Sequence, residues 1–330
     1  MKNKSKRLIY IEEYVLINGI NQYLFHSGTK YDNQVLLFLH GGPGSAESLF
    51  AHVFQQKWED IFTVVHWDQR GSGKTLTNNP DKYPTIDLML KDLFEIIQYL
   101  KKKYNKQKII ILGHSWGSVL GSTFIKKYPD EVAYYIGVGQ VISMIENERV
   151  GYEKVKELIL QSNDKKSLKK LQVLGDYPGD KFDSEFMKKC GKIRRLQGKY
   201  NLAMKIGLSM IIAALKSPIF KLSDILALIK GPKVNEEILE FLFPFDLNAE
   251  SGEYKVPIYY ILGGNDWQTP YVIAQEYFSR INAPHKNLYL IPNAGHMTMM
   301  DQPQLFFDVL LEINNKEIYD YEICSNTSKK

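Results

Sequence analysis

Short apolar runs that alternate with helical patterns constrain the fold of this chain more than any other feature. Each run is nearly continuous, which is typical of a strand buried on both faces of a parallel sheet. The runs are residues 35–39, 63–67, 108–112, 132–138, 257–262 and 287–291. Helical patterns lie between or after them, at residues 86–104, 118–128, 271–281 and 303–313. This alternation predicts an α/β fold, with a mostly parallel central sheet and helices on both of its faces.

Two stretches depart from the alternation. Residues 8–17 and 22–26 alternate between apolar and polar side chains around Asn18-Gly19, which predicts a β-hairpin. Residues 143–249 are helical in pattern and stand between two core strands, where an insertion would lie over the ligand-binding edge of the sheet. We therefore expect a core formed by residues 1–142 and 250–330, a helical cap or lid at 143–249, and a frayed C-terminal tail at 325–330.

Composition restricts the compartment and the partners. Apolar residues make up 44% and charged residues 24% of the chain, and the net charge of +5 is spread over the sequence, with no basic face rich in aromatic residues. Glu12-Glu13 interrupts the N-terminal apolar run, and residues 206–215 are too short to span a bilayer. The two cysteines have neither disulfide nor metal-site spacing. We expect a cytoplasmic protein without nucleic-acid or membrane partners, metal or cofactor; the sequence does not predict the oligomeric state.

The segment Gly113-His114-Ser115-Trp116-Gly117 carries the main chemical signal. It joins an apolar run to a helical pattern, and a serine on such a sharp turn projects its hydroxyl toward a substrate. Glycines two positions before and after the serine are needed because a Cβ there would collide with the turn. The N–H of Trp116, at the start of the helix, would face the oxygen that becomes negative during attack. Ser115 is thus the candidate nucleophile.

A serine nucleophile needs a base, and the base needs an orienting carboxylate. His296 follows the last expected strand and Asp266 follows the strand before it, so both lie at the same edge of the sheet as Ser115. We expect His296 and Asp266 to complete a catalytic triad, with Asp301 as the alternative acid. His114 is expected to point away from the reactive side of Ser115, and His66 to be a core histidine.

Two further glycine-rich loops follow strands. In His40-Gly41-Gly42-Pro43-Gly44 the glycines let backbone N–H groups approach a ligand, and Gly42 is the expected second oxyanion donor, with Gly41 as the alternative donor. In Trp67–Gly73 we expect Asp68 and Arg70 to pair and to brace neighbouring loops. The following Lys-Thr lacks the leading glycine of a phosphate-binding loop.

Together these motifs resemble the proline iminopeptidase branch of the α/β-hydrolase superfamily. The matching segments are 40–44, 67–73, 113–118, 263–266 and 295–296. The resemblance implies a serine hydrolase with Ser115 as nucleophile, His296 as base and acid, Asp266 as orienting acid, and Gly42 and Trp116 as the oxyanion hole. It also implies a substrate whose free amine is held by glutamates of the cap.

The cap departs from that branch. An aromatic-rich segment ending in Trp-Glu and a Glu-Asn-His-Tyr-like segment are absent from the cap at 143–249, and the stretch 194–200 supplies Gln197 where a glutamate is expected. Gly41, Glu146 and Gln197 are the candidate substrate-binding residues. Other glutamates that could meet an amine are Glu148, Glu185, Glu236 and Glu237. The apolar window 204–215 could instead line a pocket for an acyl chain.

The sequence therefore predicts a serine hydrolase that cleaves an amide or ester through an acyl-enzyme intermediate. An aminopeptidase of the proline iminopeptidase type, acting on short peptides or another small molecule, is the leading hypothesis. A carboxylesterase or lipase-like enzyme with a hydrophobic cap pocket is the alternative. A non-catalytic binding protein on the same scaffold is the more remote one, because a binding module does not require a strained serine turn.

Overall fold

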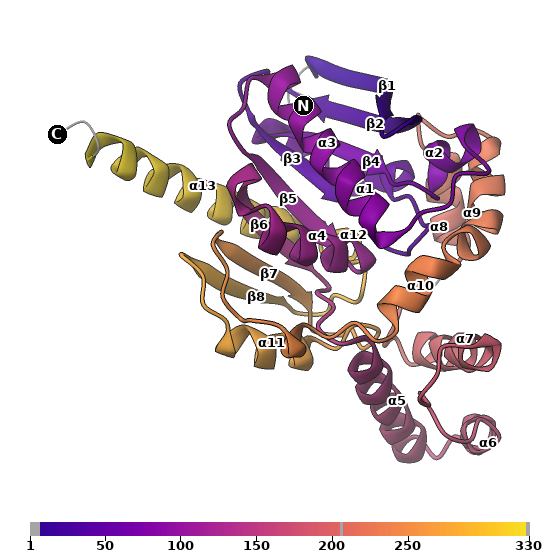
Figure 1. Cartoon of the computed structure of the whole chain (residues 1–330). Coiled ribbons are helices and arrows are strands. Elements are labelled where there is room, and N and C mark those ends of the chain that lie inside the picture. Colours follow the sequence, from indigo (N-terminus) through magenta and orange to yellow (C-terminus); the bar gives the residue numbers. More distant parts are fainter. Residues whose placement is uncertain (1–6, 205–206, 328–330) are drawn as a thin grey trace, which may run out of the picture.

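The computed structural model describes residues 7–204 and 207–327 of the 330-residue chain. Its centre is an eight-stranded sheet in the order β1-β2-β4-β3-β5-β6-β7-β8 (Figure 1). The strands are β1 (Ile9–Ile17), β2 (Ile20–Gly28), β3 (Gln34–Leu39), β4 (Phe62–Asp68), β5 (Ile109–His114), β6 (Val132–Val138), β7 (Ile258–Gly263) and β8 (Lys286–Ile291). β2 is antiparallel to both β1 and β4, and all other neighbours are parallel. The predicted α/β class and mostly parallel sheet are confirmed.

The N-terminal hairpin is also confirmed. Asn18 and Gly19 connect β1 to β2 and both have positive φ, at 45° and 78°. A two-residue turn with positive φ at both positions matches the right-handed twist of the flanking strands, and Asn-Gly is the sequence that adopts it most readily.

Helices cover both faces of the sheet, and each face has its own buried cluster. The helices outside residues 143–249 are α1 (Ala51–Phe54), α2 (Gly73–Asn78), α3 (Ile86–Tyr104), α4 (Trp116–Lys127), α11 (Tyr271–Arg280), α12 (Thr298–Asp301) and α13 (Pro303–Thr327). Helices α3, α4 and α11 contribute to one cluster, and α1, α12 and α13 to the other. In β3, Val35 and Leu37 belong to the first cluster while Leu36 and Phe38 belong to the second. Burial on both faces explains why the parallel strands read as continuous apolar runs.

The C-terminus differs from the expectation. Helix α13 continues to Thr327, beyond the expected end at residue 313, and residues 328–330 lie outside the described part of the chain. The fraying of the tail stays a prediction.

Residues 143–249, which we call the cap segment, are helical and connect β6 to β7. Their helices are α5 (Met144–Gln161), α6 (Lys165–Gln172), α7 (Ser184–Lys199), α8 (Leu208–Leu215), α9 (Ser223–Val234), α10 (Glu236–Leu242) and the short 3-10 helix η4 (Leu247–Ala249). Figure 1 shows α5, α6 and α7 projecting from the sheet, whereas α9 lies near α2. The status of the cap segment as a separate domain stays a prediction.

Helix α9 contacts the core at two points. The ammonium group of Lys74, on α2, lies 2.7 Å from Asp224 Oδ2, and both side chains are buried. Gly231 of α9 passes over the loop that follows β3, where a Cβ on Gly231 would lie only 2.9 Å from the carbonyl oxygen of Gly44. The cap segment therefore touches the loop that contains Gly42.

Within residues 7–204 and 207–327, no helix combines the length and the apolar character needed to cross a bilayer.

Candidate active site

The turn at Ser115 is sharp, as the sequence predicts. Strand β5 ends at His114, α4 begins at Trp116, and Ser115 between them has φ 52°, a left-handed conformation that few serines adopt. A Cβ on Gly113 would overlap the carbonyl of Gly117, and a Cβ on Gly117 would overlap the carbonyl oxygen of Leu39. Both glycines are therefore required by close backbone contacts.

Asp266 and His296 lie together at the carboxyl edge of the sheet. Nδ1 of His296 is 2.8 Å from Oδ2 of Asp266, and both residues are buried. Oδ1 of Asp266 accepts hydrogen bonds from the N–H groups of Gln268 and Thr269, at 2.9 and 3.0 Å, and the Thr269 hydroxyl donates to Oδ2 at 2.6 Å. The carboxylate is thus fixed by the turn that follows β7.

These contacts also set the charge of Asp266. Burial alone would raise the pKa of the Asp266 carboxyl, but the neighbouring His296 and the hydrogen bonds from Thr269 outweigh burial and hold its pKa below the ordinary value. Asp266 is ionised at neutral pH, which is the state in which a carboxylate can orient a histidine and stabilise its protonated form.

Ser115 and the Asp266–His296 pair both lie against the end of β6. The N–H of Ser115 donates to the carbonyl of Val138 at 3.0 Å. At the next residue, Gly139, a Cβ would lie 3.3 Å from Asp266 Oδ2 and 3.4 Å from His296 Nδ1. In the described part of the chain, no hydrogen bond joins the Ser115 hydroxyl to His296, so the complete triad stays a prediction.

Two backbone N–H groups beside Ser115 are free to meet an oxyanion. Gly42, with φ 114°, and Trp116, the first residue of α4, both line the pocket that contains Ser115. Neither N–H has a hydrogen-bond partner among the residues the structure describes. The N–H of Gly41, by contrast, donates to Oε1 of Glu47 at 3.2 Å. Gly42 and Trp116 are therefore the available donors, and Gly41 is already engaged.

The sequence did not predict the buried pair that Glu47 and His114 form next to Ser115. Oε1 of Glu47 lies 2.7 Å from His114 Nδ1, and His114 Nε2 lies 2.9 Å from the carbonyl oxygen of His296. Glu47 thus links the loop at Gly41, the turn at Ser115 and the loop that carries His296. Both ring nitrogens of His114 are engaged by these partners and not by the Ser115 hydroxyl. No local motif marks Glu47, because it lies 67 positions before its partner His114.

Burial and pairing act in opposite directions on this pair. Burial alone would raise the pKa of Glu47 and lower that of His114. Their mutual attraction outweighs burial, so the pKa of Glu47 is held below its ordinary value and the pKa of His114 is raised above it. The pair is therefore ionic over part of the acidic pH range.

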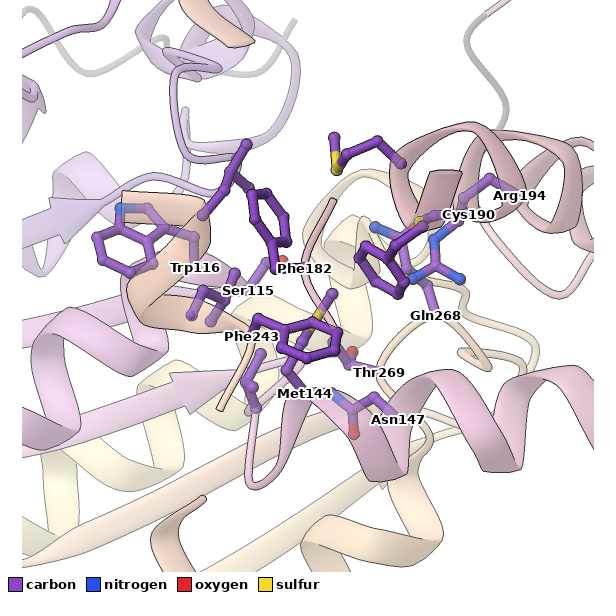
Figure 2. A pocket seen from close by; sticks show the side chains of 16 residues that line it. Ser115, Trp116, Met144, Asn147, Phe182, Cys190, Arg194, Phe243, Gln268 and Thr269 are labelled. Atoms are coloured by element: carbon purple, nitrogen blue, oxygen red, sulfur yellow. The ribbon is translucent and has the colours of Figure 1, made fainter. Parts of the chain in front are cut away.

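The pocket at Ser115 lies between the sheet edge and the cap segment. The residues that line it are Gly42, Ser115, Trp116, Val141, Met144, Asn147, Phe182, Phe186, Met187, Cys190, Arg194, Leu239, Leu242, Phe243, Gln268 and Thr269. In Figure 2, Ser115 and Arg194 lie on opposite sides of the view, with the rings of Phe182 and Phe243 between them. Most of the wall is apolar and comes from α5, α7, α10 and the residues that flank them.

The far end of the pocket is polar. The Arg194 guanidinium pairs with Glu148, which also accepts a hydrogen bond from the Tyr177 hydroxyl, and Arg194 Nη1 donates to Gln197 Oε1 at 2.7 Å. Burial alone would lower the pKa of Arg194, but Glu148 raises it, so this side chain stays cationic. Asn147 is buried at the same pocket, and its Nδ2 has no partner among the described residues. The pocket thus presents one cation and an unpaired amide.

Several predicted residues do not reach the pocket as expected. Glu146 is outside the pocket lining and pairs with Arg149, and Gln197 is fully buried and holds Arg194 and the Trp267 carbonyl oxygen. Asp301 accepts a hydrogen bond from the Gly295 N–H at 2.8 Å.

Two expectations for β4 and the loop that follows it have different outcomes. The predicted Asp68–Arg70 pair is wrong: Arg70 binds Asp92 at 2.7 and 3.0 Å, and Asp68 accepts hydrogen bonds from the Ser48 hydroxyl and the Lys74 N–H. His66 is a core histidine as expected, because it hydrogen-bonds Gln55 and burial lowers its pKa to about 3.

Among the described residues, no group of three or more His, Cys, Asp or Glu side chains could hold a metal ion.

Comparison with known proteins agrees with this architecture. The family described as serine aminopeptidase, S33, matches residues 31–195. The Bacillus subtilis (strain 168) protein named "Probable aminopeptidase YbaC" is 28% identical over 308 residues, which cover 93% of this chain and 96% of that protein. A proline iminopeptidase of Saccharolobus solfataricus is 24% identical over 314 residues, with 92% of each chain covered. The crystal structure of the Mycobacterium smegmatis proline iminopeptidase aligns with a TM-score of 0.66 at 18% identity, covering 93% of this chain and 98% of that one.

The chain belongs to the serine aminopeptidase S33 family of α/β-hydrolases, in its proline iminopeptidase-like branch.

Proposed function

We propose that this protein is a serine hydrolase that cleaves an acyl bond with Ser115 as nucleophile, His296 as general base and acid, and Asp266 as the orienting carboxylate. The observation that supports this most directly is the 2.8 Å contact between Asp266 and His296 at the sheet edge where Ser115 occupies its left-handed turn. A buried, ionised carboxylate on Nδ1 leaves Nε2 of His296 free to accept a proton.

The proposed reaction has two halves. His296 takes the proton of the Ser115 hydroxyl as its oxygen attacks the substrate carbonyl, and the negative oxygen is met by the N–H groups of Gly42 and Trp116. The tetrahedral intermediate collapses as protonated His296 gives its proton to the leaving amine or alcohol. Water, deprotonated by His296, then attacks the acyl-enzyme, releases the acid and restores the Ser115 hydroxyl.

Within this class we propose an aminopeptidase that releases an N-terminal residue from short peptides. Membership of the family and the aminopeptidase names of the relatives support this substrate. The apolar wall of Phe182, Phe186 and Phe243 suits an uncharged side chain on the residue to be released. The unpaired atom of Asn147 is the donor Nδ2, so the acceptor that this proposal assigns to the substrate ammonium is the Glu148 carboxylate beside Arg194.

A carboxylesterase acting on a hydrophobic acyl ester is the second candidate. The charged side chain that lines the Ser115 pocket is the cation Arg194, and the Glu148 carboxylate beside it is already neutralised. A substrate ammonium would have to compete with Arg194 for Glu148, since burying that charge unpaired is costly. An ester without an amine meets no such cost.

Two measurements test these proposals. Labelling by an active-site-directed fluorophosphonate should occur at Ser115, and Ser115→Ala should abolish labelling and lower turnover by about 10⁴-fold or more while thermal unfolding is unchanged. Labelling of another residue would disprove the nucleophile.

The substrate is decided by comparing alanyl-, leucyl- and prolyl-arylamides, their N-acetylated counterparts, and short p-nitrophenyl acyl esters. An aminopeptidase hydrolyses the free-amine amides and loses activity on the N-acetylated ones. Activity on the esters with none on any free-amine amide would remove the peptidase and retain the serine hydrolase.

A further inference from the structure

Helix α9 of the cap segment has the reverse of the usual arrangement of side chains. Its inward stripe consists of small or polar residues: Asp224, Ala227, Gly231 and Val234 are buried. Ala227 and Val234 form a small cluster with Leu76 of α2. A surface helix normally buries its large apolar side chains and exposes polar ones. On α9 the large apolar side chains face outward.

The exposed apolar side chains extend over both α8 and α9. On and beside α9 they are Leu222, Ile225, Leu226, Leu228 and Ile229, and on α8 they are Leu208, Ile211, Ile212 and Leu215. The exposed fraction reaches 77% for Leu222 and 71% for Ile229. None of residues 208–215, all of which are described, is buried. We call these nine residues the α8–α9 surface. An apolar concentration of this size marks an interaction site rather than an ordinary protein surface.

The segment that carries this surface is rich in lysine. The exposed charged residues between 207 and 235 are Lys216, Lys221, Lys230 and Lys233. The acidic residue in that range, Asp224, is buried and already paired with Lys74. None of the four lysines forms an ion pair with another described residue. The α8–α9 segment therefore joins exposed apolar side chains with four exposed lysines, and the next exposed charged residues, Glu236 and Glu237, begin α10.

We infer that the α8–α9 surface docks this protein onto an anionic lipid surface. The apolar side chains would enter the boundary between headgroups and acyl chains, while the lysines would meet the negatively charged headgroups. A second copy of the chain suits this surface less well, because a two-fold contact would bring one set of lysines against the other. The four lysines within the segment thus favour an anionic lipid.

This inference departs from the sequence-based expectation that the protein has no membrane partner. That expectation considered whether a segment is long enough to span a bilayer, whereas docking depends on which face of a helix the fold exposes. Apolar residues at helical spacing in the sequence are usually buried, and here the small residues between them are buried instead.

The position of the α8–α9 surface relates it to the catalytic region. Ser209 and Met210 of α8 line a cleft together with Met297 and His296. Gly231 of α9 rests on Gly44, in the loop that holds Gly42. A bilayer held by this surface would therefore lie beside the cleft that His296 lines.

Flotation of the full chain with lipid vesicles tests the docking directly and does not depend on catalysis. Binding is expected to vesicles of phosphatidylglycerol mixed with phosphatidylcholine, and to fall by about tenfold or more with phosphatidylcholine alone. The variant Leu226→Gln/Ile229→Gln should lower the partition coefficient by about tenfold or more, because both side chains lose apolar area that the lipid would cover. Lys230→Gln/Lys233→Gln should weaken binding only to the anionic vesicles.

Matched controls distinguish binding through this surface from nonspecific binding to lipid. Leu160→Gln/Val173→Gln removes two equally exposed apolar side chains from α5 and the end of α6, and Lys82→Gln/Lys91→Gln removes two exposed lysines of the core. Both control variants should bind as the parent does. The inference is overturned if the parent does not float with anionic vesicles or if control and α9 variants bind alike. It is also overturned if sedimentation without lipid shows a dimer that Leu226→Gln/Ile229→Gln dissociates, since a second copy would then occupy the surface.

Discussion

The sheet edge at Ser115 and the cap segment above it are built in different ways. At the sheet edge, backbone geometry dominates: the Cβ of any residue other than glycine at 117 would overlap the carbonyl oxygen of Leu39. On α7 of the cap segment, by contrast, Gly191 has open space where a Cβ would be, although Gly151 and Gly231 of the same segment lie against core backbone. The sheet edge at Ser115 therefore tolerates little change of sequence, while the pocket wall on α7 can vary through ordinary substitutions.

The largest expected effect tests the acid at the sheet edge. Asp266→Asn should lower kcat by about 10⁴-fold, because an amide at this position no longer fixes His296 in the orientation that frees Nε2. The matched change is Asp301→Asn, which removes a carboxylate bound to the Gly295 N–H and should lower kcat less than tenfold. Steady-state kinetics on the best substrate of the panel measure both. Equal losses in the two variants would contradict the assignment of Asp266.

The second effect contrasts glycines of the two regions. Gly117→Ala should lower the free energy of unfolding by about 4 kcal/mol or more, because its Cβ meets rigid backbone that cannot move aside. Gly191→Ala, on α7, should raise it by up to about 1 kcal/mol, because alanine favours a helix and meets nothing within 4 Å. Chemical denaturation gives both values. A destabilised Gly191→Ala would show that the cap segment is as constrained as the sheet edge.

A smaller effect concerns the buried pair beneath the serine. Glu47→Gln should lower the free energy of unfolding by about 1–3 kcal/mol, because His114 loses a charged partner. The raised pKa of His114 makes its contribution complete below the ordinary value of 6.5 and lost as pH rises through the folded value. The lowered pKa of Glu47 makes its contribution complete above 4.5 and lost as pH falls through the folded value. The difference from the parent should therefore be greatest between about pH 4.5 and 6.5.

Thermal unfolding across this pH range measures the difference. The control is Glu59→Gln, which alters another buried glutamate, one that binds Arg7 away from the candidate site. It should leave kcat unchanged, whereas Glu47→Gln should reduce kcat through the loop at Gly41. A difference that stayed constant from pH 4.5 to 8 would refute the ionic character of the Glu47–His114 pair.

The sequence predicted the sheet well because its strands are buried on both faces. Strand β6 and helix α3 agree with the expectation at both ends, and the Asn18-Gly19 turn was recognisable from its residue types. Ser115, Asp266 and His296 were candidates because each follows a parallel strand, and such positions share one edge of the sheet.

What the sequence did not predict depends on contacts between distant segments. Arg70 could have paired with Asp68, two positions away, yet it binds Asp92 on α3. In the sequence Glu148 is one of several cap glutamates, and only the structure shows that it pairs with Arg194. The sequence also did not predict which face of α9 is exposed, because periodicity gives the spacing of apolar residues and not the side on which the core lies.

The close approach of Gly231 to Gly44 has a practical consequence for engineering. A chimera that exchanges the entire lid between relatives must reproduce this backbone-to-backbone crossing, or a bulkier residue will push against the strand-end loop beside the nucleophile. Replacing only residues 182–199, which carry Phe182 and Phe186 of the pocket wall, avoids that crossing, so new acyl preferences are best sought there.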